Sequence, residues 1–301
     1  MQNNFLQSKD WLDFQRQAAR EVFTYEKGLV RANIIKHDLY LGKNYLYVPY
    51  GPVLIDNSIE KEKKIKNDIV KFIKDIKEIA GREKSIFIKI EPQSDFIADK
   101  LAEGRFKKSD KNLQPHKTQI IDLSFELEEL LKDMHHKTRY NIGLAQKKNV
   151  EIREISAEDF DNVWRLYNET AKRNKFYLHS KSYYLKLVGF RGEELNFRQF
   201  GAFTGNRLLA AGIFGFYKDT VYYLHGASNS ELKEYMGPYA LHWRLLQDAK
   251  EKGFKYYDFW GIDPVNWPGV TRFKLGFGGR TVEYPGAFDK PVKLIWWWIY
   301  K

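Results

Sequence analysis

One short segment near the C-terminus, FKLGFGG (residues 273–279), combines an aromatic residue, a lysine and three glycines. The lysine, Lys274, could supply a fixed positive charge that stabilises negative charge developing on a reacting oxygen. The residues alone favour a simpler interpretation, in which Lys274 is a solvated strand lysine beside a core phenylalanine, Phe273. A chemical role for Lys274 therefore needs support from the rest of the chain.

A second candidate is Glu91, which ends the expected strand KSIFIKIEP (residues 84–92), directly before Pro92. An acidic side chain at a strand end can face a cleft, where it could accept a proton or hold a substrate amine. An ordinary strand-end acid is the alternative interpretation. The sequence leaves both open.

A basic cluster surrounds the start of an expected helix after residue 134 and includes Lys137, Arg139, Lys147 and Lys148. Such a cluster suits the phosphates of a nucleic acid or of a nucleotide diphosphate. A solvated helix face explains a run of charges equally well, so the cluster by itself does not identify a ligand.

The composition bounds the possible classes of protein. A chain of 301 residues is long enough for two domains, and 43% hydrophobic with 16% aromatic residues excludes a disordered chain. The 50 Lys and Arg against 39 Asp and Glu give a net charge of +11, which indicates either a polyanionic partner or selection for solubility. Cysteine is absent, which excludes disulfides, thiol nucleophiles and Cys-ligated metals.

Neither a metal site nor a membrane span is expected. The histidines that attract attention lack the i, i+4 spacing of a helical metal pair; they are His116, His135, His136 and His225. The N-terminus has no apolar signal region, and no run reaches the roughly 18 apolar residues that a spanning helix needs. We therefore expect a cytoplasmic protein.

The expected elements form a mixed α/β chain in which each half runs through helices, a strand meander, then a helix and a strand. Expected helices cover residues 8–21, 58–81, 157–175, 180–190 and 237–253, with two more inside 124–156. Expected strands cover residues 29–39, 44–55, 84–92, 115–124, several within 197–228, and 255–262. No low-complexity linker separates the halves, and we place their boundary near residue 145.

The second half contains a strand, a helix beginning at Gly237 and Pro238, and another strand. This β-α-β order is the one in which acyltransferases of the GNAT type bind an acyl carrier through free N–H groups at the helix start. A coenzyme A site there needs a glycine-rich loop, whereas Pro238 has no N–H to donate. Acyl-CoA is therefore a poor candidate donor.

Six stretches, in order along most of the chain, resemble a known family. They are YVPYGPV (47–53), IKIEP (88–92), MHHKTRYNIGLAQKKNVEI (134–152), HGASNSELKEYMGPYALHW (225–243), AKEKGFKYYDFWGI (249–262) and FKLGFGG (273–279). The family is that of the Fem-type (FemABX) peptidoglycan-bridge aminoacyltransferases. These enzymes carry an amino acid from aminoacyl-tRNA to an amine on the stem peptide of a cell-wall precursor.

The resemblance implies a fold of two GNAT-like domains around a cleft. We expect the first to cover residues 1–144, joined by residues 285–301, and the second to cover residues 145–284. Some members carry a long helical arm, but no charged heptad run of that length is present here, so the chain resembles the compact members. The C-terminal KPVKLIWWWIYK (290–301) would then be a final strand on the first domain, with contact to a membrane interface as the alternative.

The resemblance also implies roles for individual residues. Lys274, with Phe273, would contact the tRNA acceptor end or the developing oxyanion. Residues expected to bind substrate are Glu91, Tyr184, Lys181, Arg139, His225 and Arg16. Two positions depart from the family pattern, since Ser180 replaces a phosphate-binding arginine and Gln15 replaces a phosphate-binding lysine. These departures leave open whether the acceptor is nucleotide-linked or lipid-linked.

The sequence thus predicts a tRNA-dependent aminoacyltransferase that extends a peptidoglycan precursor, with aminoacyl-tRNA as co-substrate and no cofactor or metal. We expect a monomer, and a lipid-linked acceptor would bring it to the inner leaflet of the membrane. Two alternatives remain: a GNAT-type N-acyltransferase that uses acyl-CoA, and a non-catalytic tRNA-binding protein.

Overall fold

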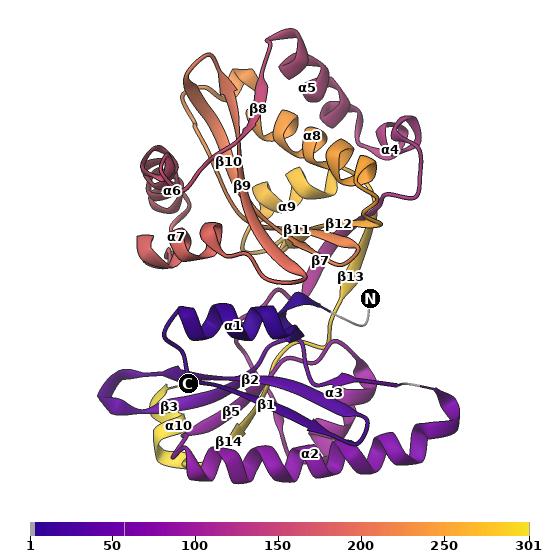
Figure 1. Ribbon diagram of the computed structural model, residues 1–301, viewed down its shortest axis with the longest axis vertical. Helices are drawn as coiled ribbons and strands as arrows, with labels where there is room; N and C mark the ends of the chain where they lie inside the picture. Colours follow the sequence, from indigo (N-terminus) through magenta and orange to yellow (C-terminus); the bar gives the residue numbers. More distant parts are fainter. Residues whose placement is uncertain (1–3, 57, 301) are drawn as a thin grey trace. The chain divides into compact units, whose positions relative to one another are not determined.

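The computed structural model describes residues 4–56 and 58–300 and divides the chain into two compact units (Figure 1). Unit 1 comprises residues 1–116 and 283–301, and unit 2 comprises residues 117–282. Among the described residues, no helix combines the length and the apolar character needed to cross a bilayer. The same part of the chain contains no grouping of three or more His, Asp or Glu side chains that could hold a metal ion.

Unit 1 contains both helices and strands. In chain order they are η1 (Phe5–Gln7), α1 (Lys9–Gln17), β1 (Val22–Lys27), β2 (Val30–Asp38), η2 (Tyr40–Gly42), β3 (Asn44–Val48), β4 (Val53–Leu54), η3 (Ile59–Lys61), α2 (Glu62–Arg82), β5 (Phe87–Ile90), α3 (Asp95–Glu103), β6 (Lys107–Lys108), β14 (Phe288–Pro291) and α10 (Leu294–Tyr300).

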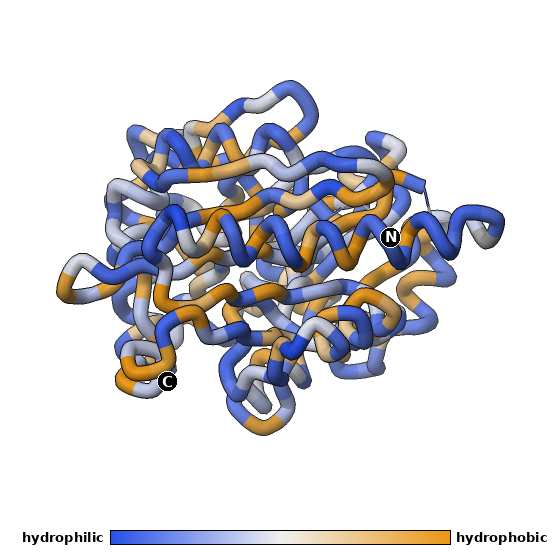
Figure 2. The backbone as a smooth tube through the Cα atoms, turned by 90° about the horizontal axis from the view of Figure 1, so that it is seen from below, coloured by the Kyte–Doolittle hydropathy of each residue, from blue (hydrophilic) through white to orange (hydrophobic). Residues whose placement is uncertain are grey.

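The strands described in unit 1 form a mixed sheet in the order β1-β2-β3-β5-β14-β6, with β4 paired to β2. Alternate residues of β2 face opposite sides of this sheet. Ala32 and Ile34 join the core beneath α2 and α3, whereas Asn33, on the other side, donates hydrogen bonds to the carbonyl oxygens of Leu6 and Ser8. Helix α2, seen in front in Figure 2, shows hydrophobic residues alternating with hydrophilic ones, as expected for a helix that covers a sheet.

Unit 2 likewise contains both helices and strands. They are β7 (Lys117–Asp122), α4 (Leu127–Asp133), α5 (His136–Lys147), β8 (Glu151–Glu154), α6 (Phe160–Asn174), α7 (Lys181–Gly189), β9 (Leu195–Thr204), β10 (Arg207–Tyr217), β11 (Thr220–Ser228), η4 (Lys233–Tyr235), α8 (Gly237–Glu251), β12 (Tyr256–Gly261), α9 (Pro268–Leu275) and β13 (Arg280–Glu283).

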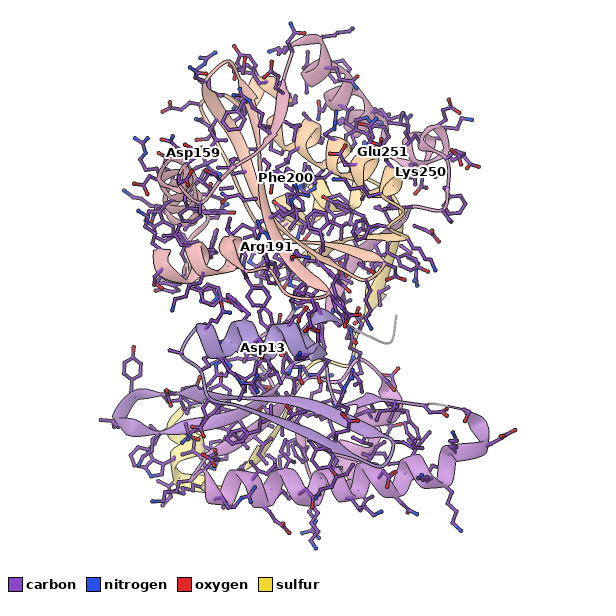
Figure 3. All side chains as sticks on the ribbon, in the orientation of Figure 1. Asp13, Asp159, Arg191, Phe200, Lys250 and Glu251 are labelled. Atoms are coloured by element: carbon purple, nitrogen blue, oxygen red, sulfur yellow. The ribbon has the colours of Figure 1, made fainter. Side chains whose placement is uncertain are left out.

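The strands described in unit 2 form a sheet in the order β13-β7-β12-β11-β10-β9-β8. Helix α8 packs on one face together with α5, and α6 and α7 cover the other (Figure 1). Phe200 of β9 belongs to the α8 side of the core, and Arg191 ties α7 to β9 by donating to the carbonyl oxygens of Val188 at 2.7 Å and Phe197 at 2.6 Å (Figure 3). The expected β-α-β order is present, because β11 and β12 are parallel neighbours joined through α8.

The division into units differs from the expected boundary near residue 145. Residues 117–144 belong to unit 2 because β7 pairs with β12 and because Leu130 and Ile142, from α4 and α5, lie in the core around α8. Strand pairing, which links residues far apart in the chain, decides the boundary here.

The C-terminal segment also differs from expectation. We expected residues 290–301 to be one strand, but β14 ends at Pro291, and α10 follows from Leu294. Proline lacks the N–H that a continuing strand would donate. The helix then packs Trp297 into a cluster with Tyr45 and Phe87, so the segment does contact unit 1, but as a helix.

Candidate active site

The site in unit 2 is built where β11 and β12 stop pairing. The two strands pair only from Thr220–Tyr222 to Tyr256–Asp258, and β12 is irregular after Asp258, where its register with β7 shifts. Trp260 there has a φ of 59°, in the left-handed region that non-glycine residues rarely adopt. Such a bulge redirects side chains, and bulges occur often beside active sites.

Asp258 is fully buried at this bulge. Its Oδ1 atom accepts hydrogen bonds from the Thr118 hydroxyl and, at 2.7 Å, from the Trp260 N–H. Burial raises the pKa of Asp258 to about 6, while these two hydrogen bonds and the charge of Lys274 act in the opposite direction. The hydrogen bonds therefore hold the carboxyl group in place, while burial makes its ionised form less favourable than it is in water.

Helix α9 carries Lys274 and is set up by local signals. Pro268 occupies its first turn, where a missing N–H costs nothing. The turn before it is closed by Asp263, whose Oδ1 atom accepts from the N–H groups of Val265 and Asn266 at 2.9 and 2.8 Å. The Thr271 hydroxyl in turn accepts from the Asp263 N–H at 2.8 Å, which fixes the helix against the loop.

Lys274 is only 7% exposed, so it is not the solvated strand lysine that the residues alone favoured. Its Nζ atom donates a 2.6 Å hydrogen bond to the carbonyl oxygen of Gly261 and lies 5.4 Å from the centroid of the Tyr223 ring. Burial lowers its pKa to about 7, although the charge of Asp258 opposes this shift. At neutral pH the side chain can thus act as a cation and can also lose its proton.

Phe273 points into the aromatic core of unit 2. Its ring centroid lies 5.0 Å from that of Tyr239, 5.3 Å from that of Phe277 and 5.4 Å from that of His242. His242 itself is buried, with Nδ1 2.6 Å from the Tyr257 hydroxyl oxygen, and burial holds its pKa well below the usual range. The structure therefore gives Phe273 a packing role that anchors α9 and so positions Lys274.

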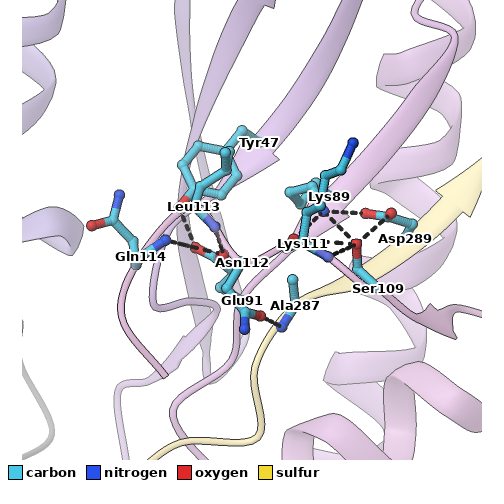
Figure 4. Close-up of polar contacts among 10 residues, drawn as sticks. All are labelled: Tyr47, Lys89, Glu91, Ser109, Lys111, Asn112, Leu113, Gln114, Ala287 and Asp289. Carbon is cyan, nitrogen blue, oxygen red and sulfur yellow. Dashed lines mark hydrogen bonds and ion pairs between the residues drawn. The ribbon is translucent and has the colours of Figure 1, made fainter. Parts of the chain in front are cut away.

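Glu91 lies in unit 1 and is 2% exposed. Its carboxylate accepts from the Tyr47 hydroxyl, from the Leu113 N–H at 2.5 Å and from the Gln114 N–H at 3.1 and 3.2 Å (Figure 4). Burial raises its pKa to about 7, and the hydrogen bonds from Tyr47, Leu113 and Gln114 oppose that shift. The carboxylate thus fixes the loop before β7, an arrangement that differs from the expected acid facing a cleft.

A buried ion pair supports the same loop. Lys89 Nζ lies 2.8 Å from Asp289 Oδ1 and also donates to the Ser109 hydroxyl at 2.7 Å and the Lys111 carbonyl oxygen at 3.0 Å (Figure 4). Asp289 comes from β14, so the C-terminal strand helps to hold the loop from residue 109 on. Because both charges are buried, loss of either partner would leave the other uncompensated.

Tyr184 and His225, two of the expected substrate-binding residues, lie together in unit 2. Tyr184 of α7 makes an edge contact with His225 of β11 at 5.1 Å and stacks on Tyr167 at 5.5 Å between ring centroids. Burial lowers the pKa of His225 to about 3, with His179 acting in the same direction, so its imidazole is neutral at physiological pH. Tyr184 is buried and His225 is half-buried, so the pair is an uncharged aromatic contact that lies largely inside unit 2.

The remaining expected residues make contacts within the chain, and those of Lys181 and Arg16 are ion pairs on the surface. Lys181 pairs with Asp161 at 2.5 Å, and Arg16 pairs with Asp13, labelled in Figure 3, also at 2.5 Å. Arg139 donates to three carbonyl oxygens at the end of α4; these belong to Leu131, Lys132 and Met134. Arg139 therefore caps α4, which accounts for its place in the sequence without a phosphate ligand.

A sequence profile of the FemAB family matches residues 103–198 and 190–301. The chain belongs to the FemAB family. Two curated relatives from Staphylococcus epidermidis match over shorter segments: aminoacyltransferase FemB is 34% identical over 97 residues, and aminoacyltransferase FemA is 32% identical over 103 residues. These segments span 31% and 32% of this chain but only 23% and 25% of the relatives, or about a quarter of their length.

Solved structures extend the likeness to nearly the whole FemAB chain at the level of fold. FemX aligns with a TM-score of 0.81 at 18% identity, covering 99% of this chain and 94% of FemX. A tandem GNAT protein from the clavulanic acid biosynthesis pathway aligns with a TM-score of 0.55 at 12% identity, covering 96% of each chain. The mixed α/β fold with two GNAT-like halves is therefore confirmed.

Sequence reasoning about this FemAB chain missed three groups at the site. Asp258 could have been identified from the sequence, since burying an acid inside the apolar strand YYDFWG costs free energy unless the acid is paired. Thr118, its hydroxyl partner, carries no comparable signal. The Gly261 carbonyl that orients Lys274 is a backbone group, and its position depends on the bulge.

Proposed function

We propose that this FemAB chain transfers an amino acid from aminoacyl-tRNA to an amine on the stem peptide of a peptidoglycan precursor. The observation that supports this proposal best is the buried Lys274, whose ammonium group is oriented by the Gly261 carbonyl and balanced by Asp258. A buried, oriented cation with few competing water contacts is suited to stabilise charge that appears only in a transition state.

In the proposed reaction the acceptor amine attacks the ester carbonyl carbon of the aminoacyl group. A C–N bond forms, negative charge develops on the carbonyl oxygen, and the C–O bond to the tRNA ribose then breaks. The amine loses one proton and the departing ribose oxygen gains one, so the products are an amide and uncharged tRNA. Lys274 in its protonated form would stabilise the developing oxyanion, a contribution that can amount to about 3 kcal/mol.

The proposed substrates fit other features of the chain. A net charge of +11 suits tRNA, and Lys137 and Lys147 are exposed on α5. For the acceptor we propose the region of unit 2 around Tyr184 and His225, with Lys181 on the same helix as Tyr184. Arg139 would act indirectly there, by holding α4 next to α5. The proposed reaction requires no cofactor beyond the charged tRNA, and we propose that a monomer carries it out.

The test is a transfer assay with the full chain, total tRNA charged with labelled amino acids, and either nucleotide-linked or lipid-linked pentapeptide precursor. The proposal predicts a mass gain of one aminoacyl residue, lost in Lys274→Ala and retained in the exposed control Lys172→Ala. Lys274→Met, which keeps the side-chain length without the charge, should behave like the alanine variant. Normal turnover by a folded Lys274→Met protein would overturn the proposal.

Because a tandem GNAT protein shares this fold, an acyl-CoA is assayed as an alternative donor. The start of α8 argues against it, because Pro238 offers no N–H to a pyrophosphate group. Saturable binding of coenzyme A with acyl transfer would favour this alternative. Binding of tRNA that ignores aminoacylation, without transfer, would favour a tRNA-binding protein.

A further inference from the structure

The outward side of α10 is entirely apolar. Leu294, Ile295, Trp298 and Ile299 are 65%, 77%, 67% and 70% exposed, and their i, i+1, i+4, i+5 spacing places them on one side of the helix. A surface helix normally presents polar residues there. This side is therefore an exposed apolar patch, a feature that marks interaction surfaces in other proteins.

The opposite side of α10 fixes its orientation. Trp297 is buried with Tyr45 and Phe87, and the Tyr300 ring stacks on Phe87 at 5.3 Å between centroids. These contacts fill the inner side of the helix, which lies beside β3 in Figure 1. The outward residues therefore cannot turn inward without removing Trp297 from the core of unit 1.

A loop of the same unit extends the patch. Tyr40 and Leu41 lie between β2 and β3 and are 94% and 80% exposed. The loop adjoins α10, because Lys43 Nζ lies 4.2 Å from the ring centroid of Trp296. We call this combined patch the α10 surface; it consists of Tyr40, Leu41, Leu294, Ile295, Trp298 and Ile299.

Lysines are the charged residues of the two segments that carry the α10 surface. Residues 39–45 and 290–300 contain Lys43, Lys290 and Lys293 and no acidic residue. Asp38 and Asp289 directly precede these segments, and Asp289 is paired with Lys89. Tryptophan, tyrosine and lysine are the residues that proteins place at the boundary between lipid headgroups and acyl chains. Hydrophobic residues, orange in Figure 2, alternate with paler ones near the C-terminal end, and the described helices include none that spans a bilayer.

We propose that the α10 surface docks this protein on an anionic lipid bilayer. The outward side chains of α10 and Leu41 enter the headgroup boundary, while Lys43 and Lys293 meet lipid phosphates. A second copy of the chain is a poorer occupant, since two such surfaces would bring lysines of like charge together. A bilayer supplies the complementary negative charge. This docking does not depend on the proposed transfer reaction.

Vesicle flotation with the full chain tests the proposal. Vesicles with 30% phosphatidylglycerol in phosphatidylcholine should bind about tenfold more tightly than phosphatidylcholine alone, and added salt should weaken that binding. The double variant Ile295→Glu with Ile299→Glu should lose binding by about tenfold or more. Val70→Glu is the matched control, because Val70 is 58% exposed on α2, outside the α10 surface.

Two further measurements identify the residue that contacts the bilayer and the molecule that covers the α10 surface. Trp298→Phe should still bind, but brominated lipids should quench less of its fluorescence than in the unmodified protein. Light scattering reports the oligomeric state. Absent binding to anionic vesicles, or unchanged binding by the double variant, would overturn the proposal. A dimer that the double variant dissociates, without vesicle binding, would assign the surface to a second copy instead.

Discussion

The Nζ atom of Lys274 donates a 2.6 Å hydrogen bond to the carbonyl oxygen of Gly261, thirteen residues earlier in the chain. This bond joins helix α9 to the end of β12, at the bulge that also carries Asp258. A lysine ammonium group has three donors, so two remain for other acceptors. Lys274 is thus oriented by the backbone while its charge is left available.

The charge state of Lys274 should depend on Asp258. The anion of Asp258 favours the protonated lysine, so Asp258→Asn should move the pKa of Lys274 below its value of about 7. Transfer that depends on the cation should then decline at a lower pH than in the unmodified protein. NMR titration of the lysine side-chain signals checks the shift. Asp248→Asn, which removes the negative charge beside the exposed Arg244, should leave it unchanged.

Glu91 should make stability depend on pH. Its pKa is raised from 4.5 to about 7, so the folded state binds a proton that the unfolded state has released between these values. Stability should therefore fall as pH rises from about 4.5 to 7, by up to about 3 kcal/mol at 1.36 kcal/mol per pKa unit.

Glu91→Gln has no proton to release and should lack this part of the dependence. Urea unfolding at pH 5 and pH 8 measures it, and the difference between the two proteins isolates Glu91 from other titrating groups. Relative to the unmodified protein, the glutamine variant should become more stable as pH rises. Parallel pH profiles for the two proteins would contradict the assignment.

Arg139 should act on stability more than on tRNA binding. Arg139→Ala removes the guanidinium donor that three carbonyl oxygens at the end of α4 share, which should lower the free energy of unfolding by about 1 kcal/mol. Thermal unfolding measures this loss. Binding of tRNA should change less than in Lys147→Ala. A large loss of tRNA affinity with unchanged stability would instead support direct phosphate contact.

Two glycines that flank Lys274 should respond oppositely to alanine. Gly279 has a φ of 80°, and a Cβ there would lie 2.3 Å from the Ile120 carbonyl oxygen, so Gly279→Ala should destabilise the fold by more than about 1 kcal/mol. Gly269, within α9, has open space around it, and Gly269→Ala should stabilise by about 0.5 kcal/mol. Chemical denaturation of both variants measures the difference, and equal effects would contradict it.

Much of the fold could be predicted because several strands alternate between apolar and polar residues and the long helices are amphipathic. Helix α8 is an example, since Gly237 and Pro238 mark its start and Gly253 follows its end. Helix α10 could not be predicted, because a run in which nearly every residue is apolar has no period that distinguishes a helix from a strand. Helix α9 is only eight residues long and lies between the turn closed by Asp263 and the glycine-rich residues 276–279.

The site was predictable only in part, for physical reasons. Lys274 and Glu91 are charged residues in apolar surroundings, and the structure buries both. Their partners include backbone groups of Gly261, Leu113 and Gln114, whose positions follow from strand pairing and loop path. The order of residue types along the sequence does not give the positions of these backbone groups. For Arg139 the outcome is the opposite: the sequence singled it out as a binding residue, and the structure shows it capping the end of α4.

The place of β14 constrains the order in which the protein can fold during synthesis. In the sheet of unit 1, β14 lies between β5 and β6, yet its residues 288–291 follow the whole of unit 2 in the chain. The ribosome therefore releases every strand that unit 2 needs before unit 1 can close its sheet. Until then β5 has an open edge, and Lys89 lacks its partner Asp289. A nascent chain that stalls before residue 288 would thus expose a template for aggregation.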